Sequence, residues 1–137
     1  MTTKQWVGGT IAGGIVVMAL GYIVFEWLLG DFYAANGGSA TGVSRDPQIV
    51  WAAAVGALAY AALILYALRS QAGSVNVSSG MKAGAVVGFL IWVCADFTLY
   101  GITNLNNLTL TVVDPLVELV RGGIVGAALG ALLPKLA

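Results

Sequence analysis

Long apolar stretches separated by short polar segments dominate the sequence. Four of them reach the length of about 20 residues that a helix needs to cross the hydrocarbon core of a bilayer. They run over residues 6–29, 48–68, 81–103 and 108–133. The segments between them are rich in Gly, Ser and Asn, which are typical of turns. The pattern predicts an all-α fold, with residues 1–137 forming one integral membrane domain, a transmembrane four-helix bundle.

The start of the fourth stretch allows two interpretations. Asp114 followed by Pro115 is typical of an N-cap and the first residue of a helix, because Pro there loses no N–H that the helix needs. The residue before Pro also disfavours helical dihedral angles. We favour a helix that begins at Pro115. The alternative is a continuous helix from about Leu108 that kinks at Pro115.

Composition and charge support a location in a membrane. Hydrophobic residues make up 59% of the chain and charged residues 9%, whereas an ordinary soluble domain has about 25% charged residues. So few charges argue against a soluble enzyme, a nucleic-acid-binding protein or a disordered chain. Four basic residues fall on one side of the predicted membrane and one on the other: Lys4, Arg69, Lys82 and Lys135 against Arg45. Because basic residues gather on the cytoplasmic side, both termini are expected to be cytoplasmic.

The residue types restrict the chemistry. The chain has no His, the commonest proton shuttle near neutral pH and the commonest metal ligand. Its single Cys, Cys94, cannot form an intrachain disulfide or a thiolate cluster. We therefore expect no cofactor, no metal site, no catalytic residues and no enzymatic activity. Function must depend on carboxylates, Arg, aromatic residues, hydroxyl groups, amides and the backbone.

Small residues recur at spacings that let helices approach closely in a membrane. The stripes are Gly9 and Gly13 in the first stretch, Ala52 and Gly56 in the second, Gly84 and Gly88 in the third, and Gly122, Gly126 and Gly130 in the fourth. We favour tight packing of helices within one chain. The alternative is a surface for self-association, which the same motif can drive.

Charged and polar residues inside the apolar stretches form the main candidate site. They are Glu26, Asp96, Tyr100, Asp114, Glu118 and Arg121. The spacing of Asp114, Glu118 and Arg121 places three charges on one helical face, which we expect to point into the bundle. Arg121 is the only cation at this depth. Asp96 and Glu118 are its natural partners, in an ion pair that would hold the third stretch to the fourth.

The number of acidic groups leaves alternatives open. Four carboxyl groups against one Arg cannot all be ionised if they are buried without a bound cation. They could form a proton or cation pathway, or lie in water at the outer membrane surface. Polar residues of the segment 30–47 and of the last turn form a second candidate site, at the outer mouth: Asn36, Ser39, Thr41 and Asn104. These residues could bind a small polar ligand or form an ordinary solvated loop.

Three segments resemble a known family. DFYAANGGSATGV at 31–43, LYGITNLNNLT at 99–109 and VDP at 113–115 are similar to segments of small bacterial four-helix inner-membrane proteins, a domain of unknown function. The resemblance spans most of the chain. It implies a multi-pass protein of the bacterial inner (cytoplasmic) membrane and brings no activity. The recurrent motif positions fall on Asn36, Ser39, Thr41, Asp96, Tyr100, Asn104 and Asp114.

The small size, the glycine stripes and the lack of catalytic residue types favour a structural or accessory subunit of a larger membrane complex, or a homo-oligomer. Its partners would be the lipid bilayer, other membrane subunits or a second copy, and not nucleic acid. The alternative function is a transporter or channel component that conducts protons, cations or a small solute past Asp96, Glu118 and Arg121. The two differ in hydration, because a transport path needs water or a cavity that reaches these residues.

Overall fold

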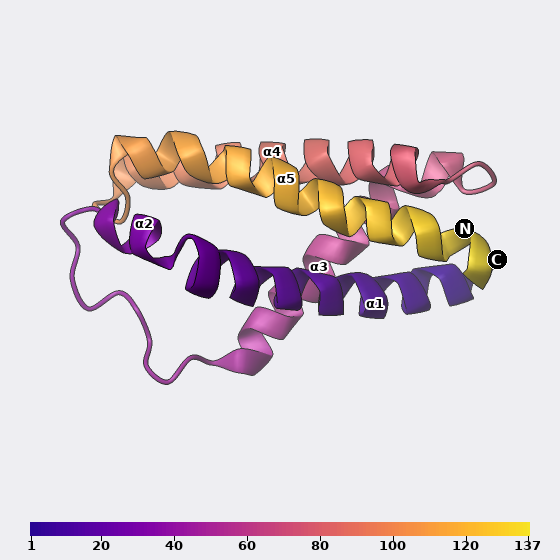
Figure 1. Ribbon diagram of the computed structural model, residues 1–137, viewed down its shortest axis with the longest axis horizontal. Coiled ribbons are helices and arrows are strands. Elements are labelled where there is room, and N and C mark those ends of the chain that lie inside the picture. Colours follow the sequence, from indigo (N-terminus) through magenta and orange to yellow (C-terminus); the bar gives the residue numbers. More distant parts are fainter.

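The computed structural model describes all residues, Met1–Ala137, and confirms four helices that are long and apolar enough to cross a membrane. The spans are Thr3–Leu28, Val50–Gln71, Val77–Ile102 and Leu108–Leu136. Both termini and the α3–α4 connection lie at one end of the molecule, here called the terminal end (Figure 1). The short helix α2 and the α4–α5 turn lie at the other end, here called the loop end.

Three of the four spans combine an α-helix with a shorter helical segment, and the third span is a single α-helix. The first consists of α1 (Thr3–Gly21) and the π-helix η1 (Tyr22–Leu28), and α2 (Gly30–Ala35) follows. The second consists of α3 (Val50–Leu68) and the 3₁₀ turn η2 (Arg69–Gln71). The third is α4 (Val77–Ile102). The fourth consists of α5 (Leu108–Leu132) and the 3₁₀ turn η3 (Leu133–Leu136).

Polar caps at the ends of the apolar stretches explain where the helices begin. Thr2 and Gln5 form a capping box at the start of α1, since each side chain accepts a hydrogen bond from the other's backbone N–H. Asn76 and Ser79 do the same for α4. Gln5 is buried, and its side-chain amide also donates to the Leu133 carbonyl at 3.0 Å. The start of the first span is thereby tied to the end of the last.

The expected break at Pro115 is wrong, because α5 is continuous from Leu108. Asn107 caps it by accepting from the Leu110 N–H at 2.8 Å. Pro115 therefore lies in the helix interior, where it removes only the hydrogen bond to the Thr111 carbonyl. Unwinding the residues before Pro115 would leave many more backbone groups without partners in a membrane, each at a cost of several kcal/mol. Asp114, which we expected as the N-cap, is instead a buried residue of the helix interior.

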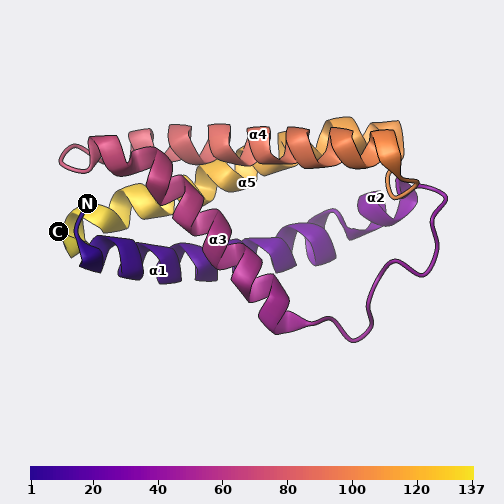
Figure 2. The ribbon, with the colours of Figure 1, turned by 180° about the vertical axis from the view of Figure 1, so that it is seen from behind.

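Glycines bring the backbones of α4 and α5 into contact, and the two helices run side by side in both ribbon views (Figures 1 and 2). A Cβ at Gly84 would overlap the Gly122 carbonyl oxygen and lie 2.9 Å from the Gly126 Cα. A Cβ at Gly88 would overlap the Glu118 carbonyl oxygen, and one at Gly130 would overlap a backbone carbonyl at the start of α4. Only glycine leaves room for this approach, as in other close helix pairs of membrane proteins.

The remaining glycine stripe joins α1 to its neighbours. A Cβ at Gly13 would lie 2.8 Å from the Ala61 Cβ of α3, and one at Gly9 would lie 3.1 Å from the Leu65 side chain. The second stretch differs from expectation, because a Cβ at Gly56 would meet no heavy atom within 4 Å. Gly56 therefore packs against no helix within the chain, whereas the stripes of the other three spans are used in internal contacts.

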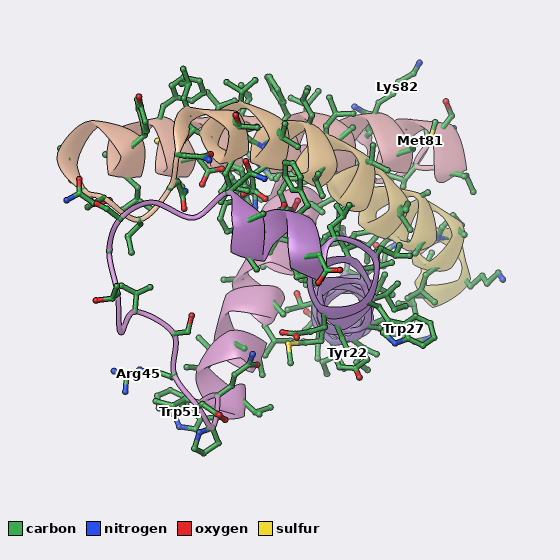
Figure 3. The ribbon with its side chains drawn as sticks, turned by 60° about the vertical axis from the view of Figure 1, so that its left-hand side comes forward. Tyr22, Trp27, Arg45, Trp51, Met81 and Lys82 are labelled. Atoms are coloured by element: carbon green, nitrogen blue, oxygen red, sulfur yellow. The ribbon has the colours of Figure 1, made fainter.

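Helix α3 crosses α1 obliquely, so that its first half leads away from the other helices (Figure 2). Its second half packs into the hydrophobic core near the terminal end. The fully buried side chains there are Ile64, Leu65, Leu68, Val125, Leu129 and Leu133. Trp27 and Trp51 are 77% and 73% exposed and point away from the protein near the loop end (Figure 3). These positions suit aromatic anchors at a membrane surface.

Candidate functional site

Arg121 is the centre of a buried polar cluster. Its Nη1 donates to Glu118 Oε1 at 2.7 Å, and its Nη2 donates to the Val17 carbonyl of α1 at 3.0 Å. The side chain of Glu118 is fully buried and that of Arg121 is 9% exposed. The ion pair lies within α5, and the second hydrogen bond links α5 to α1.

The expected pairing of Arg121 with Asp96, and with it a link between α4 and α5 through an ion pair, is wrong. Asp96 lies six residues before the end of α4, whereas Arg121 lies about halfway along α5. With a rise of about 1.5 Å per residue, the two side chains differ by roughly 10 Å in depth. Asp96 Oδ1 instead accepts from the Asn106 side chain, at 3.5 Å, in the α4–α5 turn.

Two more carboxyl groups complete the cluster toward the loop end. Asp96 and Asp114 are both buried, and Asp114 accepts a hydrogen bond from the Tyr33 hydroxyl of α2. Burial raises the pKa of Tyr33 above its ordinary value of 10.0, and the bond to Asp114 raises it further. The negative charges of Asp114, Glu118 and Asp96 act in the same direction. All three acids therefore lie close enough to influence one phenol.

The cluster has more acidic groups than its one cation can balance. Three buried carboxyl groups, those of Asp96, Asp114 and Glu118, stand against the guanidinium of Arg121. Four polar atoms have no hydrogen-bond partner: Tyr60 Oη, Asp96 Oδ2, Glu118 Oε2 and Arg121 Nε. No three acidic or thiol groups are arranged to hold a metal ion. The chemistry that this arrangement offers is the uptake of protons and of a hydrogen-bonding ligand.

Two residues expected in the buried network lie outside it. Glu26 is exposed, and its carboxylate is 3.5 Å from the Gln48 side chain that precedes α3. Tyr100 is 43% exposed. Each step of four residues rotates by about 40° around a helix. Tyr100 is four such steps after Gly84, so its side chain no longer lies on the glycine face of α4 that contacts α5.

The second candidate site is only partly assembled. The segment after α2 pairs with the α4–α5 turn, through hydrogen bonds from Gly38 N–H to the Leu105 carbonyl at 2.8 Å and from Ala40 N–H to the Asn104 carbonyl at 3.0 Å. The Asn107 side chain also donates to Asn36 Oδ1 at 3.1 Å. A Cβ at Gly38 would overlap the Asn104 carbonyl oxygen, so only glycine fits there.

Backbone pairing therefore places Asn36 against Asn107 and Asn104 against Ala40. Ser39 and Thr41 are exposed and do not join a site with them. What this loop positions is α2, whose Tyr33 reaches Asp114. The pairing of this loop with the α4–α5 turn thus places α2 beside the buried Asp114.

A cavity of about 870 Å³ lies between α1–η1 and the first half of α3. Most of its lining is apolar, and Gly56 and Ala53 form a small-residue wall on α3. Glu26 and Gln48 line it at the loop end, and Arg121 borders it near the middle of the spans. The cavity therefore joins an exposed polar edge to the buried cluster.

Aromatic rings surround the guanidinium where it meets the cavity. The Cζ of Arg121 lies 5.1 Å from the Phe25 ring centroid and 5.9 Å from that of Tyr60, and both rings line the cavity. Sequence reasoning missed Tyr60 and Phe25. The available signal was a Tyr in the middle of an apolar stretch, because Tyr in membrane helices usually lies near the membrane surface.

The first half of α3 was also misinterpreted. The sequence assigned Gly56 to helix packing, whereas Gly56 and Ala57 border the cavity. Small residues on one helical face can equally mark a close contact or an open space, and only the path of the neighbouring helix decides between them.

No family model, curated protein or solved structure matches this chain.

Proposed function

We propose that this chain is a component of a membrane transporter that takes up a small solute in the cavity between α1–η1 and α3. The observation that carries this proposal is the cavity's reach to Arg121, a buried cation far from either end of its span. Ionisable residues in such positions commonly mark substrate or ion pathways. A cavity of this size, mostly apolar with a few polar groups, is also typical of small-molecule sites.

The polar edge of the cavity lies near the loop end. The cavity reaches Glu26 and Gln48 near the loop end, whereas Ile64, Leu65 and Leu129 are fully buried and fill the core toward the terminal end. This arrangement favours one state of a transporter, open toward the loop end, over a continuous channel. The cavity would accordingly bind a solute and would not conduct ions continuously.

A structural or accessory subunit, or a homo-oligomer, has less support. The glycine stripes that favoured self-association are used within the chain, as at Gly13 against Ala61 and Gly84 against Gly122. Of the stripe glycines, only Gly56 contacts no helix within the chain, and it lines the cavity. A stoichiometric protein partner after gentle extraction from the native membrane would nevertheless favour the accessory function over transport.

We infer further that the four spans form a bundle in a bacterial inner membrane with both termini in the cytoplasm. The resemblance to small bacterial membrane proteins supports the location. The basic residues support the orientation, because Lys4, Lys82 and Lys135 belong to the terminal end and Arg45 to the loop segment. The cavity would then open toward the outer side.

Cysteine accessibility tests the proposed cavity. In a Cys94→Ser background, Gly56→Cys places a thiol on the cavity wall without a clash, since a Cβ there meets no heavy atom within 4 Å. Val55→Cys is the matched control, because Val55 is the preceding residue, does not line the cavity and is 59% exposed on the apolar outer surface of α3. Both variants would be treated from outside with a charged, membrane-impermeant thiol reagent.

Gly56→Cys should react and Val55→Cys should not, because the reactive thiolate forms in water and not in lipid. An unreactive Gly56→Cys would show that the cavity is closed to outside water and would overturn the proposal. Equal reaction of both variants would also contradict the proposal, since water would then reach the outer surface of α3 as well as the cavity wall.

A further inference from the structure

We infer that the solute is a small organic anion with an apolar body, and that it binds Arg121 together with one proton, which Glu118 takes up. This inference rests on the proposed function, because it names the chemistry of the solute for the same cavity. It follows from the unused donor on Arg121, from the charge already beside it and from the apolar walls.

The anion follows from Arg121. The guanidinium can only donate hydrogen bonds, and its Nε has no partner although the side chain is more than nine-tenths buried. Gly21 lets the guanidinium lie close against α1, because a Cβ there would be only 3.3 Å from Nη2. Carboxylates and related planar or tetrahedral anions are the acceptors that match a guanidinium best. The apolar body follows from cavity walls such as Met18, Leu63 and Ile91.

The proton follows from charge balance. Glu118 already neutralises Arg121 at 2.7 Å. A second anion would leave an unbalanced buried charge, which is strongly unfavourable. Glu118 Oε2 has no hydrogen-bond partner and can receive a proton. Protonation of Glu118 cancels the added charge, and the Arg121–Glu118 bond is exchanged for a bond between Arg121 and the solute.

The surroundings of Glu118 supply a route for that proton. On α5 it is faced by Arg121 and, one turn nearer the loop end, by Asp114. Tyr60 faces it from α3 and Asp96 from α4. Tyr33 of α2 adjoins this set of residues, because its hydroxyl donates a hydrogen bond to Asp114. These groups extend from α2 at the loop end to the ion pair, so a proton from outer water can reach Glu118 without crossing the apolar core.

Hexanesulfonate is the probe for this inference. Its charge is constant between pH 5 and 9, so any pH dependence of binding belongs to the protein. Binding would be measured by calorimetry on the whole chain in phosphatidylcholine nanodiscs, with empty nanodiscs subtracted, in buffers of different ionisation enthalpy. The wild-type affinity should rise by up to about tenfold for each pH unit lowered, with uptake of one proton per anion, because one pH unit is worth about 1.4 kcal/mol per linked proton.

Glu118→Gln should bind with the wild type's low-pH affinity at every pH and take up no proton. Glu26→Gln is the matched control, because it neutralises an acid that lines the same cavity but lies exposed near the loop end. It should keep the wild-type pH dependence. A pH dependence that persists in Glu118→Gln, or that disappears in Glu26→Gln, would overturn the role of Glu118. Failure of the wild type to bind hexanesulfonate at any pH would overturn the anionic class.

Gly56→Phe separates the failure of this inference from failure of the proposed function. It fills the cavity at a position where the backbone tolerates a side chain, and it should abolish hexanesulfonate binding. Unchanged binding would place the anion outside the cavity and contradict the proposed site itself. Nanodiscs containing phosphatidylglycerol identify the source of the anion: competition with hexanesulfonate supports a lipid anion at Arg121, and no competition supports a water-soluble one.

Discussion

Gly84→Ala tests the close approach of α4 and α5 with the smallest possible change. The added Cβ would overlap the Gly122 carbonyl oxygen and lie 2.9 Å from the Gly126 Cα. Both neighbours are backbone atoms of a helix, so neither can move aside as a flexible side chain would. The two helices must therefore separate along their contact, and the neighbouring glycine contacts loosen with them.

The expected magnitude follows from two opposing effects. Alanine favours the helix by about 1 kcal/mol relative to glycine. Overpacking a tight contact costs about 1–3 kcal/mol and more where the backbone must shift, and separation also weakens the packing on either side of Gly84. We expect a net loss of about 2 kcal/mol in the free energy of unfolding, which is roughly a thirtyfold change in the ratio of folded to unfolded protein.

Gly101→Ala is the matched control, because Gly101 lies on the same helix and a Cβ there meets no heavy atom within 4 Å. It should be as stable as the wild type or more stable, by up to about 1 kcal/mol. Both variants would be unfolded by titrating dodecyl sulfate into mixed micelles, with loss of helical circular dichroism as the signal. Equal stability of Gly84→Ala and Gly101→Ala would refute backbone contact between α4 and α5.

Three further predictions concern the polar residues. Arg121→Ala should lower the free energy of unfolding by about 3–5 kcal/mol, because it leaves Glu118 buried without its partner, whereas Asp96→Asn should cost only about 1 kcal/mol; equal and negligible losses in the same titration would contradict this. Stability should fall as the pH rises above about 10, because the folded state holds the pKa of Tyr33 above its ordinary value and the unfolded chain ionises first. Tyr33→Phe should show a smaller decrease between pH 8 and 11, and an unchanged decrease would count against the bond to Asp114. Asn107→Ala should cost about 1–2 kcal/mol through loss of the α5 cap, and equilibrium unfolding that matches the wild type would show that the cap is dispensable.

The helical spans could be predicted because they depend on local properties. The length of an apolar stretch and the polar residues at its ends are visible in the sequence, and the bilayer thickness sets the scale. The same holds for the face that carries Asp114, Glu118 and Arg121, since a rigid helix fixes which residues share a side. These three residues are buried together.

The partners of those residues could not be predicted in the same way. Arg121 bonds the carbonyl of Val17, a backbone group that every residue carries and that leaves no signal in the sequence. The start of α5 depended on whether Asn107 or Asp114 supplied the cap, and both residue types are good N-caps. Asn107 is the residue used because its side chain also contacts Asn36 of the loop, a contact between distant parts of the chain.

The two opposite uses of glycine in this chain explain why a tight helix pair and an open cavity lie next to each other. At Gly84 the missing side chain lets two backbones touch, and at Gly56 it leaves space that no helix fills. Arg121 lies on the boundary between these regions, paired with Glu118 on the tightly packed α5 and bordering the cavity beside α3. Its second bond, to the Val17 carbonyl, does not involve Glu118. The proposed exchange of Glu118 for a solute anion would therefore leave the bond between α5 and α1 in place, and the glycine-packed part of the protein would stay intact.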